Sequence, residues 1–257
     1  PSNTETWPGH RLERVEKVYL DILNALTLFE EVNLLVHPKA FSRLENQLLI
    51  NNLKLIIHEY PINDIWARDC GPIFIEEGGR FNITNWEYNA WGQKYPPWDA
   101  DNRIPEYVAD YLDIPLHSTG MVLEGGAIET NGKGTLITTE SVMLNPNRNP
   151  HLTKAEIESK LREYFGIERF IWLKAGLAGD DTDGHVDDLT RFLNEDTVVT
   201  MITDDPTYPN YEVLNSNFRI LGKSGLNIET LPMPECRIEG TTVDGSEYVP
   251  ASYANYY

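Results

Sequence analysis

The segment Asp180-Asp181-Thr182-Asp183-Gly184-His185-Val186-Asp187-Asp188 places five carboxylates around one imidazole and continues directly into an apolar-rich segment, residues 189–200. Carboxylates this close together repel one another, which predicts a positively charged ligand or a metal ion as their partner. A solvated acidic loop is the alternative, because many charge clusters only cover a surface. The apolar residues that follow predict that this charge lies at the entrance of a strand.

The composition indicates a globular protein. The chain has 257 residues, 41% of them hydrophobic and 11% aromatic, which is enough for a sizeable core. This length allows one large domain or two small ones, and of these we expect a single domain over residues 1–257. A net charge of -19 argues against nucleic acid or an anionic membrane as a partner. Cys70 and Cys236 are far apart and form no CxxC pair, so we expect a reduced, cytoplasmic protein without a disulfide framework or a thiolate metal cage.

A strand-turn-strand-helix-strand unit is predicted three times, after an N-terminal segment with helices at 11–28 and 41–51 and strands at 32–36 and 53–58. The units begin near Trp66, Leu123 and His185, at intervals of 57 residues (123 minus 66) and 62 residues (185 minus 123). Their expected helices are 104–112, 154–165 and 211–222, and their expected strands are 72–75, 80–86, near 116, 126–129, 135–139, 169–173, 189–193, 197–201 and 227–231. A fixed period predicts a repeat architecture in which each unit buries a face on the next.

The start of each unit carries polar residues, and pseudo-symmetry predicts that they meet. These residues are Asp69, Glu124, and the pair His185 and Asp187. We expect the pair to lie on one side of a strand, because residues two apart in a strand face the same way. Such a group suits acid–base chemistry beside a guanidinium or an ammonium. One histidine with hard oxygens fits magnesium or calcium only loosely, so no metal is expected.

Other motifs allow two interpretations each. The aromatic residues of 91–98 could bind a cation or an apolar chain, or could pack in the core. The turn-rich segment 145–150 is typical of structural punctuation, although polar loops can also line an active face. Arg68 beside Asp69 could belong to a functional group at a strand entrance, or could form a structural bridge to a carboxylate. Cys70 is expected to be a packed residue, because its strand position points it away from the side of Asp69.

Five motifs together resemble the agmatine deiminases, the branch of the guanidino-group-modifying superfamily that also includes the Porphyromonas-type peptidylarginine deiminases. The resemblance covers nearly the whole chain. It is carried by Trp66-Ala67-Arg68-Asp69-Cys70-Gly71-Pro72, Leu123-Glu124-Gly125-Gly126, Leu144-Asn145-Pro146-Asn147-Arg148-Asn149-Pro150, Gly179-Asp180-Asp181-Thr182-Asp183-Gly184-His185-Val186-Asp187-Asp188, and Pro250-Ala251-Ser252-Tyr253-Ala254-Asn255-Tyr256-Tyr257.

The resemblance implies an α/β fold, a five-bladed propeller (pentein) of ββαβ units around a central channel. It also implies an amidine hydrolase that converts agmatine to N-carbamoylputrescine and ammonia through a covalent cysteine intermediate, with no metal or organic cofactor. A homodimer is plausible. The alternatives are a deiminase of peptidyl or free arginine, and a non-catalytic protein that binds cationic amines or a divalent ion.

The resemblance also implies roles for residues of this chain. Asp69 and Asp187 would grip the guanidinium nitrogens, His185 would act as acid and base, and Glu124 would orient the guanidinium or His185. Trp91 and Asp183 would meet the far end of the substrate. Asp64 remains an alternative to Asp69 as the residue that contacts the substrate.

The chain departs from the family pattern at the nucleophile. The family cysteine lies near the C-terminus, and this sequence stops at Tyr257 before any such motif. Cys236 lies in a linker and matches nothing catalytic. We therefore assign no nucleophile, and we expect a chain truncated at both ends with the last ββαβ unit largely missing.

Overall fold

The computed structural model describes residues 3–4, 6–48, 54–235, 237–238 and 247–256. The chain divides into two compact units, each described by itself below. Unit 1 comprises Pro1–Ala67 and Pro97–Ile104, and unit 2 comprises Arg68–Pro96 and Pro105–Tyr257. The expected single domain over residues 1–257 stays a prediction.

Unit 1 contains a two-stranded parallel sheet, in which Val32 pairs with Leu55. Leu23 of the first helix and Leu44 of the second pack into one small core. The carboxylate of Asp101 accepts hydrogen bonds from the backbone N–H groups of Asn63 and Asp64. Its elements are α1 (His10–Leu26), β1 (Val32–Val36), α2 (Pro38–Leu48), β2 (Leu55–Glu59) and η1 (Asp101–Arg103). This order confirms the predicted helix-strand-helix-strand segment, whose residues 49–53 lie outside the described residues.

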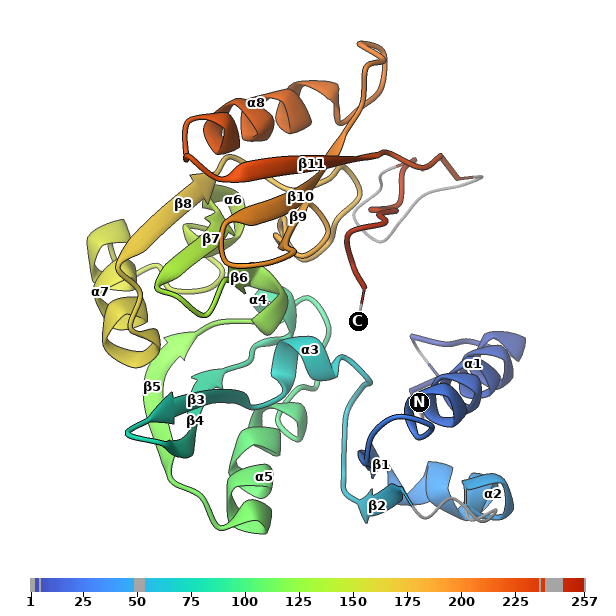
Figure 1. Ribbon diagram of the computed structural model, residues 1–257. Helices are drawn as coiled ribbons and strands as arrows, with labels where there is room; N and C mark the ends of the chain where they lie inside the picture. The colour runs from blue at the N-terminus through green and yellow to red at the C-terminus, as the bar shows by residue number, and fades with distance from the viewer. Residues whose placement is uncertain (1–2, 5, 49–53, 236, 239–246, 257) are drawn as a thin grey trace. The chain divides into compact units, whose positions relative to one another are not determined.

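Unit 2 contains three sheets of the same topology, which confirms the predicted repeat (Figure 1). In each sheet a hairpin of two antiparallel strands is followed by a helix and a strand parallel to the second. The first has β3 (Ile73–Glu77), β4 (Arg80–Glu87), α5 (Ile104–Leu112) and β5 (Leu116–Val122); the second has β6 (Ile128–Thr130), β7 (Thr135–Thr139), α7 (Lys154–Phe165) and β8 (Arg169–Leu173); the third has β9 (Thr190–Phe192), β10 (Thr197–Ile202), α8 (Tyr211–Gly222) and β11 (Asn227–Pro232).

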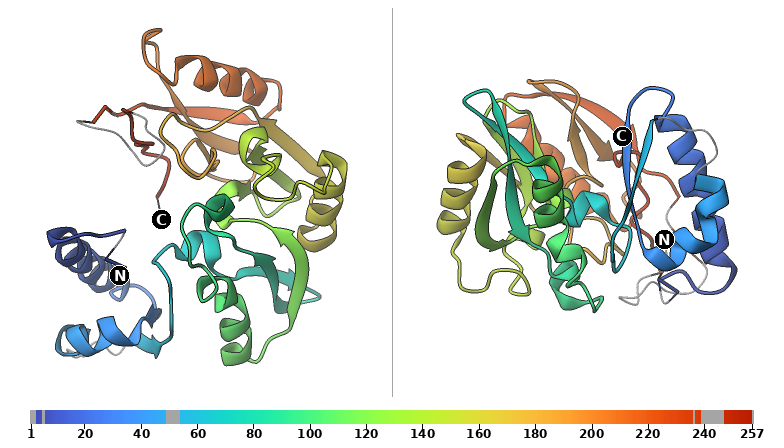
Figure 2. Two further views of the ribbon diagram at one scale, coloured as in Figure 1. Left: turned by 180° about the vertical axis from the view of Figure 1, so that it is seen from behind. Right: turned by 90° about the horizontal axis from the view of Figure 1, so that it is seen from below.

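The middle sheet, β6-β7-β8, has hydrophobic core on both faces. Leu136 and Ile137 are neighbours in β7 and are both 0% exposed, yet they belong to different hydrophobic clusters. Successive side chains of a strand point to opposite faces, which explains this division. One cluster joins the middle sheet to Met121 of β5, and the other joins it to Met201 of β10. The predicted burial of one ββαβ repeat against the next is therefore confirmed for these three repeats. Figure 2 shows their sheets from behind and from below.

Helix α7 begins and ends where the sequence predicts, because strong local signals mark both ends. Thr153 and Glu156 form a capping box: the Thr153 hydroxyl accepts from the Glu156 N–H, and the Glu156 side chain accepts from the Thr153 N–H. Gly166 ends the helix with a φ of 64°, which favours glycine. Ile157 and Leu161 bury the inner face.

Two local predictions are wrong. Asp69 and Cys70 do not stand at a strand entrance, but in the helical turn α3 (Ala67–Cys70), which Gly71-Pro72 ends before β3 begins at Ile73. His185 and Asp187 lie in a turn before β9, not on a strand. The physical reason in the second case is that side chains bind the backbone there: the Asp180 carboxylate accepts from the N–H groups of Thr182 and His185, in place of a strand ladder.

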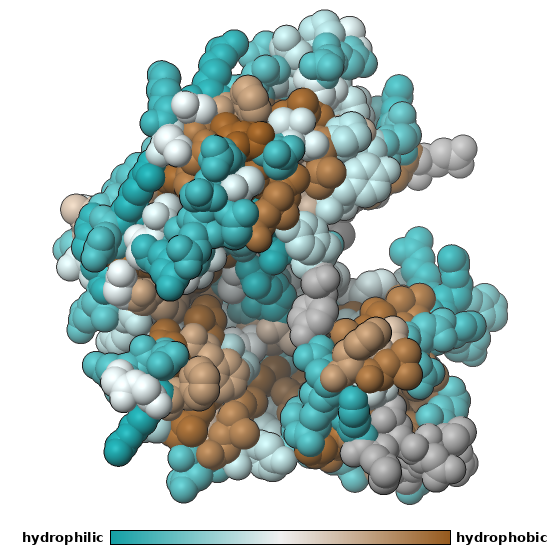
Figure 3. Space-filling view, in the orientation of Figure 1, coloured by the Kyte–Doolittle hydropathy of each residue, from teal (hydrophilic) through white to brown (hydrophobic). Residues whose placement is uncertain are grey.

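The outer hairpin β3-β4 keeps large hydrophobic side chains at the surface. Phe74 is 47% exposed and Phe81 is 63% exposed, and hydrophobic surface lies over this part of the molecule in Figure 3.

None of the helices in the described part of the chain combines the length and apolar character that crossing a bilayer requires.

The capping box of α7 predicts a measurable loss of stability. Replacing Thr153 by Ala removes the hydroxyl that accepts from the Glu156 N–H, and we expect the free energy of unfolding to fall by about 1 kcal/mol. Urea denaturation measures it. The control is Ser159→Ala at an exposed position of the same helix, where we expect no loss. Equal stability of Thr153→Ala and the wild type would contradict the capping role.

Candidate active site

Three functional groups of unit 2 converge on the backbone of Gly126. A Cβ atom placed on Gly126 would lie 2.5 Å from His185 Nδ1, 2.7 Å from Asp69 Oδ1 and 2.8 Å from Asp187 Oδ2. These distances are shorter than any normal contact of a side-chain carbon, so only glycine allows the three groups to meet. His185 Nδ1 lies 3.6 Å from Asp69 Oδ1 and 4.0 Å from Asp187 Oδ1.

Asp69 is held by two donors. Its Oδ1 accepts from the Gly126 N–H at 3.0 Å, and its Oδ2 accepts from the indole N–H of Trp91 at 3.1 Å. The Asp69 side chain is only 9% exposed. Charge-assisted hydrogen bonds of this kind fix the plane and the position of a carboxylate. Asp69 is therefore prearranged beside His185.

Trp91 lies on α4 (Ala90–Gln93), a turn of left-handed helix that the sequence does not predict. The φ angles of Ala90, Trp91, Gly92 and Gln93 are 51°, 55°, 82° and 69°. A left-handed conformation costs about 1–2 kcal/mol for each residue other than glycine. Asn89 holds the turn, because its Oδ1 accepts from the Gly92 N–H at 2.8 Å. Such strain, maintained where it orients a side chain, is typical of functional sites.

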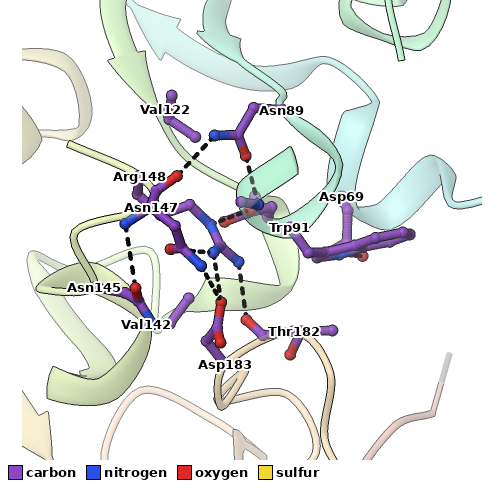
Figure 4. A network of polar contacts seen from close by, with 12 residues as sticks. Asp69, Asn89, Trp91, Val122, Val142, Asn145, Asn147, Arg148, Thr182 and Asp183 are labelled. Atoms are coloured by element: carbon purple, nitrogen blue, oxygen red, sulfur yellow. Dashed lines mark hydrogen bonds and ion pairs between the residues drawn. The ribbon is translucent and has the colours of Figure 1, made fainter. Parts of the chain in front are cut away.

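Glu124 precedes η2 (Gly125–Ala127) and is 1% exposed. Burial raises the pKa of Glu124, while the positive charges of Arg148 and His185 act to lower it. The Arg148 Nε–H donates to Glu124 Oε1 at 2.6 Å. Figure 4 shows the surroundings of Arg148, including its bonds to Asp183 and Thr182.

His185 is 3% exposed. Burial acts to lower its pKa, but the charges of Asp69, Glu124, Asp187 and Asp180 act against burial and leave the pKa raised above the usual 6.5. The surrounding carboxylates thus favour the cationic form of the imidazole. Its Nε2 is buried and has no hydrogen-bond partner among the described residues. A buried polar atom without a partner costs about 1–3 kcal/mol, so this nitrogen is a natural place for an atom of a ligand.

Asp187 is also perturbed. Burial raises its pKa to about 6, the nearby His185 and Arg68 act to lower it, and Asp69 acts to raise it. The Arg68 Nε atom lies 3.7 Å from Asp187 Oδ2, and Arg68 also lies 3.6 Å from Glu129, so the structure shows the carboxylate bridge, one of the two interpretations that the sequence left open for Arg68.

The acidic segment 180–188 does not point all its charge to one place. The two carboxylate oxygens of Asp183 accept hydrogen bonds from Lys94 Nζ at 2.8 Å, Asn147 Nδ2 at 2.9 Å and Arg148 Nη1 at 2.6 Å. Asp181 accepts from the hydroxyl of Tyr95. The segment is therefore neutralised in part by residues of this chain, and the alternative of a merely solvated loop does not describe it.

The structure brings four of the predicted site residues together. They are Asp69, Glu124, His185 and Asp187. Trp91 adjoins them through Asp69, whereas the contacts of Asp183 run to Lys94, Asn147 and Arg148; the roles of all six at a substrate stay predictions. Asp64 belongs to unit 1, where its carboxylate accepts from Thr6. Sequence reasoning assigned no role to Arg148, although an arginine between two Asn-Pro turns was a signal.

Among the described residues, no group of three or more histidine, cysteine, aspartate or glutamate side chains is arranged to hold a metal ion. Cys70 is 4% exposed and packs in the interior, as expected. Cys236 lies outside the described residues.

A family comparison, a related sequence and two solved structures indicate the same kind of protein. The sequence pattern of the Porphyromonas-type peptidyl-arginine deiminases matches residues 1–257. The agmatine deiminase of Pseudomonas syringae pv. tomato is 39% identical over 212 residues, which are 80% of this chain and 57% of that protein. The structure of Enterococcus faecalis agmatine deiminase has a TM-score of 0.89 at 31% identity and covers 99% of this chain and 75% of its own. A cysteine-to-serine variant of C. jejuni agmatine deiminase with substrate bound has a TM-score of 0.86 at 31% identity, covering 97% and 74%.

The convergence on Gly126 predicts that a methyl group there is not tolerated. Gly126→Ala would push His185, Asp69 and Asp187 apart, and we expect the free energy of unfolding to fall by about 1–3 kcal/mol, the range for overpacking. The control is Gly222→Ala, where an added Cβ meets nothing within 4 Å. If urea denaturation gives the two variants a similar stability, the three side chains can move apart at no cost, and the prediction is wrong.

The acidic segment predicts a pH-dependent stability. Burial, with the charges of Asp187 and Asp180, raises the pKa of Asp188 to about 7. Its value in an unfolded chain is about 3.9, so this carboxyl contributes stability below pH 4 that is lost as the pH rises to about 7. Asparagine cannot titrate. We therefore expect the stability of Asp188→Asn, relative to the wild type, to increase between pH 4 and pH 8.

The control for this measurement is Asp205→Asn. Hydrogen bonds from Thr207 lower the pKa of Asp205 below its ordinary value of about 3.9, so Asp205 is ionised in the folded and in the unfolded chain above about pH 5. The stability difference between Asp205→Asn and the wild type should then stay constant between about pH 5 and pH 8. A constant difference for Asp188→Asn as well would refute the raised pKa.

Proposed function

Because the chain belongs to the Porphyromonas-type peptidyl-arginine deiminase family, we propose that it is an agmatine deiminase. It hydrolyses the guanidinium group of agmatine and releases N-carbamoylputrescine and ammonia. The names of the Pseudomonas syringae, Enterococcus faecalis and C. jejuni relatives support this substrate.

One observation carries the proposal: two carboxylates flank a buried histidine that has an unpartnered nitrogen. Asp69 Oδ1 and Asp187 Oδ1 lie 3.6 Å and 4.0 Å from His185 Nδ1, and His185 Nε2 has no partner among the described residues. A planar cation with several N–H donors satisfies such acceptors better than a spherical ion does. A guanidinium is the side group that fits this description.

In the proposed reaction, Asp69 and Asp187 hold the guanidinium nitrogens while a cysteine thiolate forms a bond to the guanidinium carbon. His185 transfers a proton to the departing nitrogen, which leaves as ammonia. His185 then accepts a proton from water as the water attacks the same carbon and the bond to sulfur breaks. The raised pKa of His185 favours the protonated form that the first step requires. We assign no nucleophile in this chain.

Glu124 orients His185 or the guanidinium in this scheme, and Trp91 holds Asp69 through its indole N–H. We further propose that the ββαβ units are part of a five-bladed α/β propeller around a substrate channel. The burial of three successive units against one another supports this arrangement. A homodimer and a cytoplasmic location stay predictions.

The proposal predicts ammonia release from agmatine by the full-length protein. His185→Ala and Asp187→Ala should each lower kcat at least about 100-fold, the loss typical of removing an acid–base group or its partner. The control is His10→Ala, a histidine whose side chain is 98% exposed in unit 1, and it should keep wild-type activity. Unchanged turnover in both site variants would refute the assigned roles.

The same assay with arginine and with an arginine-containing peptide distinguishes the substrate class. We expect kcat/KM to be highest for agmatine. At the end opposite its guanidinium, agmatine carries a single amine and, unlike arginine, no carboxylate. A preference for arginine or the peptide would replace the proposed substrate and leave the reaction type unchanged.

A further inference from the structure

Arg148 is a buried cation that the reaction does not use directly. Its side chain is 2% exposed. Its Nε donates to Glu124 Oε1 at 2.6 Å, and its Nη1 donates to Asp183 Oδ2 at 2.6 Å. Its Nη2 donates to the carbonyl oxygen of Thr182 at 2.9 Å. All three guanidinium nitrogens thus have partners on two separate segments. Figure 4 shows the contacts with Thr182 and Asp183.

Burying this charge has a cost that only a complete set of partners offsets. An isolated buried cation is strongly disfavoured, and arginine cannot escape by losing its proton. Two carboxylates and a carbonyl oxygen therefore have to stay in place around Arg148. The rigid fork of the guanidinium fixes their directions, which a single lysine ammonium could not do for three acceptors at once.

The contact with Glu124 connects Arg148 to His185 electrostatically. Burial raises the pKa of Glu124, and the charge of Arg148 is the first of the influences that lower it; His185 also lowers it and Asp69 raises it. The charge of Glu124 in turn raises the pKa of His185, together with Asp69, Asp187 and Asp180. The positive charge of Arg148 therefore favours the ionised form of Glu124, and ionised Glu124 favours the protonated form of His185.

The contacts with Thr182 and Asp183 connect Arg148 to the turn that carries His185. The hydroxyl of Thr182 and the carboxylate of Asp180 accept from the backbone N–H of His185. A shift of Arg148 would therefore move the backbone next to His185.

A third contact connects Arg148 to the left-handed turn α4. A Cβ atom on Gly92 would lie 2.8 Å from Arg148 Nη1 and would also overlap the side chain of Asn147. The Asn147 Oδ1 atom accepts from Arg148 Nη1 at 2.7 Å, and the Asn147 carbonyl oxygen accepts from Asn89 Nδ2 at 3.0 Å. The turn that presents Trp91 to Asp69 therefore rests directly on the Arg148 network.

We propose that Arg148 is a positioning residue: its guanidinium holds the Glu124 carboxylate, the turn of His185 and the turn of Trp91 in the arrangement that the site requires. The inference rests on the proposed function for its kinetic consequence, but the arrangement itself is independent of the substrate. Arg148 touches none of the reacting atoms in this account and acts through Glu124 and the two turns.

The test compares Arg148→Met and Arg148→Lys with the wild type in the full-length protein. The pKa of His185 is measured by NMR with isotope-labelled histidine, the signal being assigned by its loss in His185→Ala. In Arg148→Met we expect this pKa to fall, because Glu124 loses the charge that favours its ionised form and takes up a proton. We expect kcat for agmatine to fall about 100-fold, the usual effect of misplaced reacting groups, with a much smaller change in KM.

Arg148→Lys separates charge from geometry. The ammonium keeps a positive charge beside Glu124, so the pKa of His185 should stay close to that of the wild type. It cannot reach Glu124, Asp183 and Thr182 together, so kcat should remain reduced. A wild-type kcat in Arg148→Lys would overturn the proposal, also in the event that Arg148→Met does not fold.

Two controls complete the design. In a Glu124→Gln background, Arg148→Met should leave the pKa of His185 unchanged, because the route through Glu124 is absent; a further fall would overturn that route. Arg43→Met removes an arginine from Glu16, a buried carboxylate of unit 1, and should change neither kcat nor the pKa of His185.

The outcomes remain distinguishable from a failure of the proposed function. A wild-type protein that releases no ammonia from agmatine refutes that function, while the NMR measurement, which needs no substrate, still decides on Arg148. If the pKa of His185 is the same in Arg148→Met and in the wild type, Arg148 does not act on His185 through Glu124, and that part of the proposal is refuted.

Discussion

The absence of a side chain at Gly126 is the constraint on which the candidate site depends. Because the backbone of this residue has no Cβ, the imidazole of His185 and the carboxylates of Asp69 and Asp187 can approach it from three directions. The same residue contributes its N–H to Asp69 and accepts the N–H of Asp187 through its carbonyl oxygen at 3.3 Å. One glycine therefore creates the space and part of the hydrogen bonding. The acidic segment 180–188 acquires its chemical meaning only around this point.

The charges in the site form a balanced set and not a simple negative patch. Burial favours the protonated form of a carboxylate, and the raised pKa values of Asp187, about 6, and of Asp188, about 7, show this tendency. Glu124 has Arg148 as its partner, and Asp183 has Arg148 and Lys94. The negative charge that remains acts on His185, whose pKa is raised despite complete burial. A cationic substrate would complete this balance.

Backbone strain near the site has a structural explanation. The left-handed turn α4 is unfavourable by itself, and Asn89, Asn147 and the indole of Trp91 supply the contacts that maintain it. A tight fit between Gly92 and the Arg148 guanidinium explains why glycine stands in that turn. Local unfavourable geometry thus gives Trp91 a position from which its N–H reaches Asp69. The strained backbone of α4 and the hydrogen bond from Trp91 to Asp69 therefore depend on each other.

The sequence alone predicted the main helices and strands of the N-terminal segment and of the three ββαβ units, and their order. Periodic apolar residues and local end signals, such as the capping box at Thr153 and Gly166, act within a few residues, so helices α5, α7 and α8 begin and end where predicted. Pseudo-symmetry correctly indicated that Asp69, Glu124, His185 and Asp187 meet, although it placed Asp69 and His185 at strand entrances. Only the tertiary structure decided that they occupy turns, that α4 is left-handed, and that Arg148 is the partner of Glu124 and Asp183. These features depend on contacts between residues 24 to 58 positions apart, which no local pattern encodes.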